Sequence, residues 1–168
     1  MAEKRAKIKD NIKFIKNPRL LIYCILAVVV TSAVGMMFTD TTGWYEEIKP
    51  VITPPGYVFG IVWTILFALI ALSMYFSLLK ADKRHHKLLI NMFAVNLILN
   101  VLWSVLFFGL HSPLASFIEL GILLLSILFL IRTTWKVSQL SSWLLLPYAI
   151  WVTFAGFLNY VIIFYSFF

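Results

Sequence analysis

Three tryptophans that lie inside long apolar runs, Trp63, Trp103 and Trp151, are the residues best suited to chemistry in this sequence. Tryptophan usually anchors a membrane span at the headgroup level, and an indole N–H buried deeper than that needs a hydrogen-bond partner. Phe59 and Phe67 lie one helical turn before and after Trp63. Aromatic walls of this kind suit a flat, largely apolar ligand within the membrane. The alternative is that these rings only hold helices together, and the residues alone leave both readings open.

A stripe of polar side chains accompanies the tryptophans. Asn96, Asn100 and Ser104 recur every four residues and therefore share one face of a helix. Lipid cannot satisfy an amide, so we expect this face to meet other helices or a cavity. Tyr148 and Asn159 place further polar groups in the last apolar run.

Glu119 is the one acidic residue inside an apolar run. A carboxylate there is costly and usually faces protein or a water-filled cavity. We expect Glu119 to hold helices together, either protonated or paired with an amide of another helix. Ligand contact is the second alternative, and a role in a proton relay is the third. The sequence has no H-E-x-x-H motif and no phosphate-cradling glycine loop, and its single cysteine, Cys24, excludes an internal disulfide. We therefore expect no conventional catalytic residue, no metal site and no required cofactor.

The elements that position these residues follow from composition. Of 168 residues, 62% are hydrophobic and 12% charged, and the mean hydropathy is +0.95. Soluble domains are about 45–50% apolar and about 25% charged. Runs of roughly 20 apolar residues can cross the hydrocarbon core as helices, and their continuity argues against a β-barrel. The sequence predicts an all-α integral membrane protein, a bundle of five transmembrane helices at about 20–38, 57–79, 88–110, 113–131 and 143–164.

The basic residues predict how these spans are oriented. With five spans, thirteen of the fourteen Lys and Arg residues fall on one side of the membrane and only Lys49 falls on the other. The positive-inside rule places the thirteen in the cytoplasm, so the N-terminus is expected inside and the C-terminus outside. The net charge of +7 therefore indicates topology, and we expect contact with membrane lipid and none with nucleic acid. The few charges and the lack of a mitochondrial presequence favour a prokaryotic plasma membrane.

Residues 1–19 are predicted to form a basic cytoplasmic tail, and residues 20–168 the membrane domain. Ile8, Ile12 and Ile15 are spaced for an amphipathic helix on the lipid surface, although a tail that only sets topology explains them equally well. The first span exceeds the 7–15 apolar residues of a signal peptide, and no clear A-x-A site follows it, so we interpret it as a true span.

The loop after the first span contains few flexible residues and is expected to be stiff. Glu46, Glu47 and Lys49 are expected to form a helical turn that Pro50 ends. Thr53 is then expected to cap the second span, with Pro54 in its first position. Such a stiff loop is either a lid over a cavity or a simple connector.

Several short motifs follow one another in a recognisable order between about Gly35 and Ile163. They are Trp44-Tyr45, Lys49-Pro50, Pro54-Pro55-Gly56-Tyr57-Val58-Phe59, Val62-Trp63, the run from Asn96 to Ser104, Leu146-Pro147-Tyr148, Trp151, Phe154-Ala155 and Leu158-Asn159. In this combination the sequence resembles the tryptophan-rich sensory protein family, also known as the translocator protein or peripheral-type benzodiazepine receptor family.

The resemblance implies a five-helix bundle, commonly a homodimer, with a pocket that opens toward the first loop. It implies that the pocket takes porphyrin-type tetrapyrroles, such as protoporphyrin IX or haem-like ligands, and other small apolar ligands, for a sensory, sequestering or transport role. Some members promote light-dependent breakdown of protoporphyrin, and their two implicated tryptophans match Trp63 and Trp151. By motif position the pocket residues are Tyr45, Pro54, Phe59, Trp63, Phe67, Asn100, Trp103, Ser104, Trp151, Ala155 and Leu158.

The sequence also departs from the family pattern. Ile52 stands where the family usually has tryptophan, two residues after the Lys-Pro pair, and no basic residue follows Tyr160. Ile52 argues against stacking of the first loop on a ligand, and the missing basic residue after Tyr160 leads us to predict no specific sterol recognition. The other readings are light-dependent oxidative degradation of protoporphyrin at the same pocket, a secondary transporter, and a structural membrane scaffold. Five spans without an inverted repeat argue against the transporter.

Overall fold

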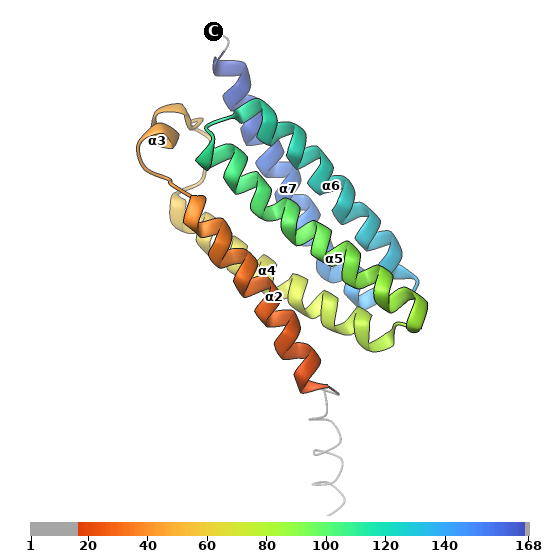
Figure 1. Ribbon diagram of the computed structural model, residues 1–168. Coiled ribbons are helices and arrows are strands. Elements are labelled where there is room, and N and C mark those ends of the chain that lie inside the picture. The colour runs from red at the N-terminus through yellow and green to blue at the C-terminus, as the bar shows by residue number, and fades with distance from the viewer. Residues whose placement is uncertain (1–16, 167–168) are drawn as a thin grey trace, which may run out of the picture.

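The structure is a computed structural model that describes residues 17–166 (Figure 1). Within this range five helices are long and apolar enough to cross a membrane, and no strand is present. The prediction of an all-α membrane protein with a five-helix bundle is therefore confirmed. The predicted tail helix around Ile8, Ile12 and Ile15 lies outside the described residues.

The helices follow the predicted spans closely. Their bounds are α2 Pro18–Phe38, α4 Gly56–Lys80, α5 Lys83–Ser104, η1 Val105–Gly109, α6 Pro113–Trp135 and α7 Gln139–Ser166. The short helix α3, Trp44–Ile48, lies in the first loop and ends before Pro50, as predicted. The third span is continued by η1, a single turn of π-helix.

Local sequence explains where several helices begin. Asn17 caps α2, because its side-chain oxygen accepts a hydrogen bond from the Leu20 N–H at 3.2 Å, and Pro18 occupies the first turn. Asp82 caps α5 in the same way, accepting from the His85 N–H at 2.8 Å. Hydrogen bonds from the backbone and ring of His85 hold the pKa of Asp82 below its ordinary value.

The second span begins within one residue of its predicted start at 57, but its predicted cap is wrong by two residues. Thr53 does not cap α4, which begins at Gly56 with Pro55 in the capping position and no side-chain cap. The reason is steric: a residue that precedes proline is pushed out of the helical region, so Pro54 cannot be helical in front of Pro55.

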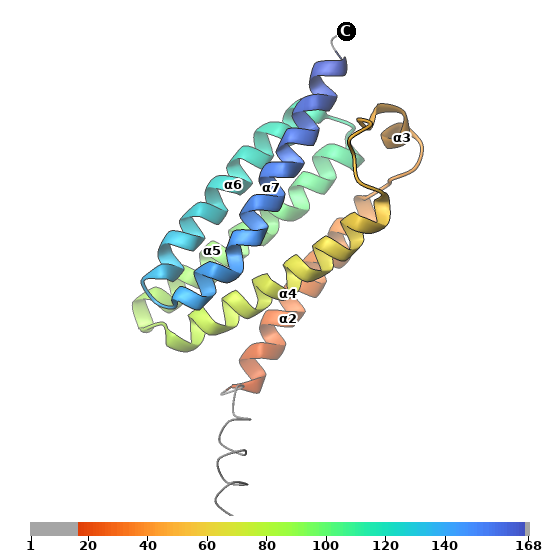
Figure 2. The ribbon, with the colours of Figure 1, turned by 180° about the vertical axis from the view of Figure 1, so that it is seen from behind.

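The bundle places α6 and α7 side by side over their length, with α5 against α6 (Figure 1). On the other side α2 packs against α4 and α5, and α4 packs against α7 (Figure 2). Buried hydrogen bonds join the helices. They include Asn96 Nδ2 to Ser126 Oγ at 2.7 Å, Ser73 Oγ to the Ser141 carbonyl at 2.8 Å, and Thr134 Oγ1 with Ser142 Oγ at 2.8 Å.

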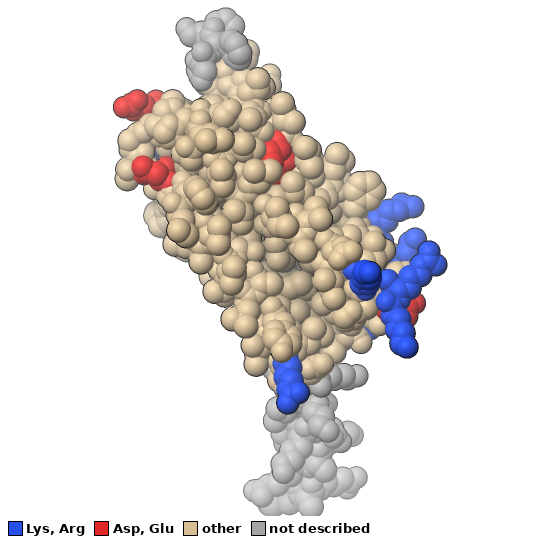
Figure 3. All heavy atoms as spheres, in the orientation of Figure 1, with Lys and Arg blue, Asp and Glu red and all other residues tan. Residues whose placement is uncertain are grey.

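Charged side chains gather at the two ends of the molecule. Lysines and arginines cluster at the end where α4 meets α5, and acidic side chains lie near α3 at the opposite end (Figure 3). We call these the basic end and the α3 end. Between them lies a broad apolar surface, as expected for a protein that sits in a bilayer.

Candidate functional site

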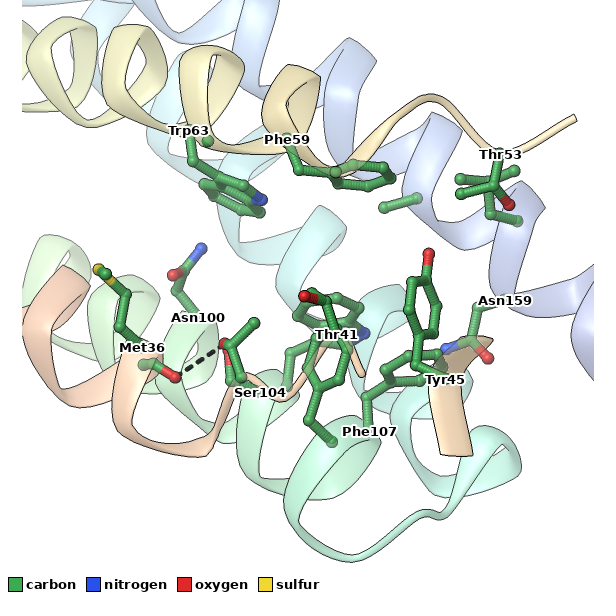
Figure 4. Close-up of a pocket in the computed structure, with 18 of the residues that line it drawn as sticks. Met36, Thr41, Tyr45, Thr53, Phe59, Trp63, Asn100, Ser104, Phe107 and Asn159 are labelled. Atoms are coloured by element: carbon green, nitrogen blue, oxygen red, sulfur yellow. Dashed lines mark hydrogen bonds between the residues drawn. The ribbon is translucent and has the colours of Figure 1, made fainter. Parts of the chain in front are cut away.

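A cavity of about 480 Å³ lies toward the α3 end, between α2, α4, α5 and α7. Figure 4 shows Phe59 and Trp63 of α4 on one side, with Asn100 and Ser104 of α5 across from them. Its volume falls in the range of small-molecule sites, about 300–1,000 Å³.

Aromatic rings make up much of the wall. Trp63 leans on Phe67 with ring centroids 5.5 Å apart, and Trp103 stacks on Phe107 at 5.3 Å with the ring planes 12° apart. Tyr45, from the first loop, meets Phe107 edge-on at 5.9 Å. These contacts hold the rings in defined positions, so the cavity presents fixed flat surfaces.

A few polar groups face this aromatic space. Asn100 Nδ2 donates to the Tyr148 hydroxyl at 3.1 Å, which leaves its side-chain carbonyl oxygen available to a guest. Ser104 Oγ and the indole N–H of Trp63 make no side-chain hydrogen bond within residues 17–166. The cavity therefore offers an acceptor, a hydroxyl and a donor beside its aromatic rings.

The α3 end of the cavity is more polar and is covered by the first loop. Glu46 and Lys49 line it and form an ion pair with each other. Burial raises the pKa of Tyr45 above its ordinary value, so its phenol is neutral at physiological pH. Trp44 fastens the loop by stacking on His111, with centroids 4.5 Å apart and planes 24° apart.

The structure brings together most of the predicted pocket residues. Ten of the eleven line the cavity: Tyr45, Pro54, Phe59, Trp63, Phe67, Asn100, Trp103, Ser104, Ala155 and Leu158. Trp151 is not on the wall. It packs edge-on against Phe59 at 5.5 Å, and its indole N–H is buried without a partner among the described residues. That these residues bind a ligand stays a prediction.

The contribution of α2 was missed in the sequence. Thr31, Ser32, Gly35 and Met36 all line the cavity. A signal was present, because small and polar residues interrupt an otherwise aliphatic span at Thr31, Ser32, Gly35 and Thr39. Gly35 lets α2 approach α5 closely: a Cβ added there would lie 3.5 Å from Ser104 Oγ.

Glu119 faces protein, as expected, but does not pair with an amide. Its side chain is 3% exposed, and neither carboxylate oxygen has a hydrogen-bond partner among residues 17–166. Two buried amides of facing helices bond other residues of α6 instead: Asn159 bonds Ser116 at 2.9 Å, and Asn96 bonds Ser126 at 2.7 Å. Glu119 is also absent from the cavity wall.

Comparison with known proteins agrees with this arrangement. The profile of the TspO/MBR family matches residues 23–165. The tryptophan-rich protein TspO of Archaeoglobus fulgidus is 37% identical over 145 residues, which cover 84% of this chain and 94% of the relative. Protein CrtK of Rhodobacter capsulatus is 34% identical over 137 residues, covering 80% of this chain and 85% of the relative. The translocator protein of Bos taurus is 29% identical over 132 residues, which cover 75% of this chain and 78% of the relative. A five-helix membrane protein matched over this much of its length belongs to the TspO/MBR family.

Proposed function

We propose that this protein binds porphyrin-type tetrapyrroles in the cavity between α2, α4, α5 and α7, to sense, sequester or move them. The observation that carries the proposal is a cavity of about 480 Å³ with aromatic rings in its wall, lined largely by residues of the membrane-spanning helices. A flat apolar macrocycle gains most where rings lie against both of its faces. The names of the relatives, sensory protein and translocator protein, fit this role.

The polar groups of the cavity suit the polar atoms of such a ligand. Trp63 supplies an N–H donor from α4, and Asn100 supplies a carbonyl acceptor from α5. The two carboxylate side chains of protoporphyrin IX point outward from the ring, and their oxygens can accept hydrogen bonds from the Trp63 indole N–H and the Ser104 hydroxyl. A purely hydrocarbon guest would leave these groups unpaired, which costs about 1–3 kcal/mol for each buried group.

Orientation is part of the proposal. The basic end is proposed to face the cytoplasm. The α3 end, where the C-terminus lies, is proposed to face the outside of a prokaryotic plasma membrane. The clustering of Lys and Arg at one end supports this assignment (Figure 3). Labelling of single cysteines introduced at Thr42 and at Arg84, in intact cells with a membrane-impermeant reagent, tests it: only the Thr42 site is expected to react.

Quenching of tryptophan fluorescence by protoporphyrin IX, in detergent or nanodiscs, tests ligand binding. Wild-type protein is expected to show saturable quenching, and Trp63→Phe combined with Trp151→Phe is expected to reduce both quenching and affinity. Trp135→Phe is the matched control, because Trp135 pairs with Trp143 and does not line the cavity. Unchanged affinity in the double variant would place the site elsewhere.

Light-dependent oxidative degradation of bound protoporphyrin is the second candidate, favoured by the indole of Trp63 in the cavity wall. An excited porphyrin and molecular oxygen would supply the chemistry, and the indole would be the reactive neighbour. Illumination in air, followed by absorbance spectra, tests it. The porphyrin bands are expected to fade faster with folded than with denatured protein, and equal rates would remove the candidate.

A further inference from the structure

Part of the cavity wall is also the outer surface of the bundle. Gly60 and Thr64 of α4 line the cavity and are exposed, and so is Met36 of α2, at 71% exposure. All three lie within membrane-spanning helices. Together with Ser32, which also lines the cavity, we call them the α2–α4 seam.

The seam is open on the α4 side and closed on the α5 side. At Gly35 a Cβ would lie 3.5 Å from Ser104 Oγ, so α2 rests directly on α5 there. At Gly60 a Cβ would meet no atom within 4 Å. Figure 4 shows the same asymmetry: Met36 and Ser104 lie together on one side of the cavity, and Trp63 and Phe59 lie on the other. The opening therefore runs between α2 and α4.

The opposite halves of these two helices are tightly joined. At the basic end the Asn17 N–H donates to the Tyr75 hydroxyl at 3.3 Å, and Cys24 and Val28 of α2 and Ile70 and Met74 of α4 are buried. The two helices are thus fastened near the basic end and part toward the α3 end. The opening lies between two helices that are long and apolar enough to cross a membrane, toward their α3 ends.

We propose that the ligand enters and leaves the cavity sideways through the α2–α4 seam, directly from the hydrocarbon of the bilayer. The ligand class is then a flat molecule dissolved in the membrane, because such a molecule is concentrated in hydrocarbon by its apolar surface. The route under the first loop is less suited to it, since Glu46 and Lys49 stand there and Trp44 is stacked on His111. This inference rests on the proposed function for its ligand.

The test is to block the seam without touching the aromatic wall. Gly60→Leu and, as a second variant, Thr64→Leu place a bulky apolar side chain in the opening. Thr64 Oγ1 bonds only the Gly60 carbonyl of its own helix, so its loss breaks no contact between helices. Gly121→Leu is the matched control, because Gly121 is an exposed glycine of α6 with no atom within 4 Å of its Cβ position and does not line the cavity.

The measurement is stopped-flow quenching of tryptophan fluorescence in nanodiscs, with protoporphyrin IX delivered from donor vesicles. Each blocking variant is expected to slow association about tenfold relative to wild type. A tenfold slower rate corresponds to about 1.4 kcal/mol of additional activation free energy for entry. Gly121→Leu is expected to associate at the wild-type rate, and Met36→Ala, which widens the seam, is expected to associate faster. A leucine that merely crowded the cavity would speed dissociation and leave association unchanged. Unchanged association in both blocking variants would overturn the inference.

A second readout separates this inference from the proposed function. If wild-type protein shows no quenching by protoporphyrin IX, the proposed function fails, and lipids with brominated acyl chains then test the seam alone. Through an open seam these chains reach Trp63 and quench it, so the loss of fluorescence is expected to be larger in wild type than in Trp63→Phe. Gly60→Leu is expected to abolish this difference. Equal quenching of wild type, Trp63→Phe and Gly60→Leu would reject the lateral opening whatever the ligand is.

Discussion

Phe59 lines the cavity, and Trp151 packs edge-on against it from behind, with ring centroids 5.5 Å apart and planes 71° apart. A second aromatic neighbour, Phe154, holds Trp151 at 5.4 Å. The two tryptophans that the family resemblance joins in one role therefore have different positions here. Trp63 lies in the cavity wall, whereas Trp151 packs against a residue of that wall.

This difference predicts unequal effects of two single substitutions. Trp63→Phe is expected to weaken protoporphyrin IX binding about fivefold, because it removes a hydrogen-bond donor worth about 1 kcal/mol. Trp151→Phe keeps an aromatic ring behind Phe59 and is expected to change the Kd by less than about twofold. Titrations that detect the porphyrin by absorbance avoid the altered tryptophan signal. A larger loss for Trp151→Phe would show that Trp151 touches the ligand.

The close contact between α2 and α5 at Gly35 is expected to limit the size of the side chain that position 35 tolerates. Gly35→Ala is expected to be tolerated and to raise stability by up to about 1 kcal/mol, because alanine favours helix and its Cβ has 3.5 Å to Ser104 Oγ. Gly35→Leu is expected to lower stability by about 1–3 kcal/mol, since it pushes the two helices apart. Thermal unfolding in one detergent checks both. Equal stability of the two variants would show that α2 is not held against α5.

The buried carboxyl group of Glu119 leads us to predict that a substitution there stabilises the protein. Its two carboxylate oxygens are buried without partners in the described part of the chain, and such groups cost about 1–3 kcal/mol each. Glu119→Leu replaces them with apolar atoms and is expected to raise the thermal midpoint, and Glu119→Gln is expected not to lower it. Ser116→Ala, which removes the hydrogen bond to Asn159, is the control expected to lower the midpoint. A fall in stability for Glu119→Leu would reveal a partner for the carboxylate.

Asp82 predicts a loss of stability in acid. Hydrogen bonds from His85 lower the pKa of this carboxyl in the folded protein. A lowered pKa means that the stabilisation is complete above the unfolded value of about 4 and is lost as the pH falls through the folded value. Asp82→Asn still caps α5 but cannot titrate, so its thermal midpoint is expected to fall less between pH 6 and pH 2. Parallel acid profiles for the two proteins would contradict this account.

Much of the architecture was predictable because a bilayer imposes strong rules on sequence. Span length and the one-sided basic residues are local signals, and the helices begin and end within five residues of the predicted positions. The caps Asn17 and Asp82 were not predicted. The stripe of Asn96, Asn100 and Ser104 was correctly expected to avoid lipid. The error at Thr53 was local as well, because the steric effect of Pro55 on Pro54 was overlooked.

The sequence by itself determined the number and extent of the spans and which faces must avoid lipid, because hydrophobic length and helical periodicity act within one segment. Only the tertiary structure decided that Trp63 stands in the cavity wall and Trp151 behind it, that α2 supplies Ser32, Gly35 and Met36, and that Glu119 is left without a partner. These outcomes depend on how neighbouring helices rotate and cross. That geometry is set by side-chain packing between segments far apart in the chain, on which the pattern within any one helix is silent.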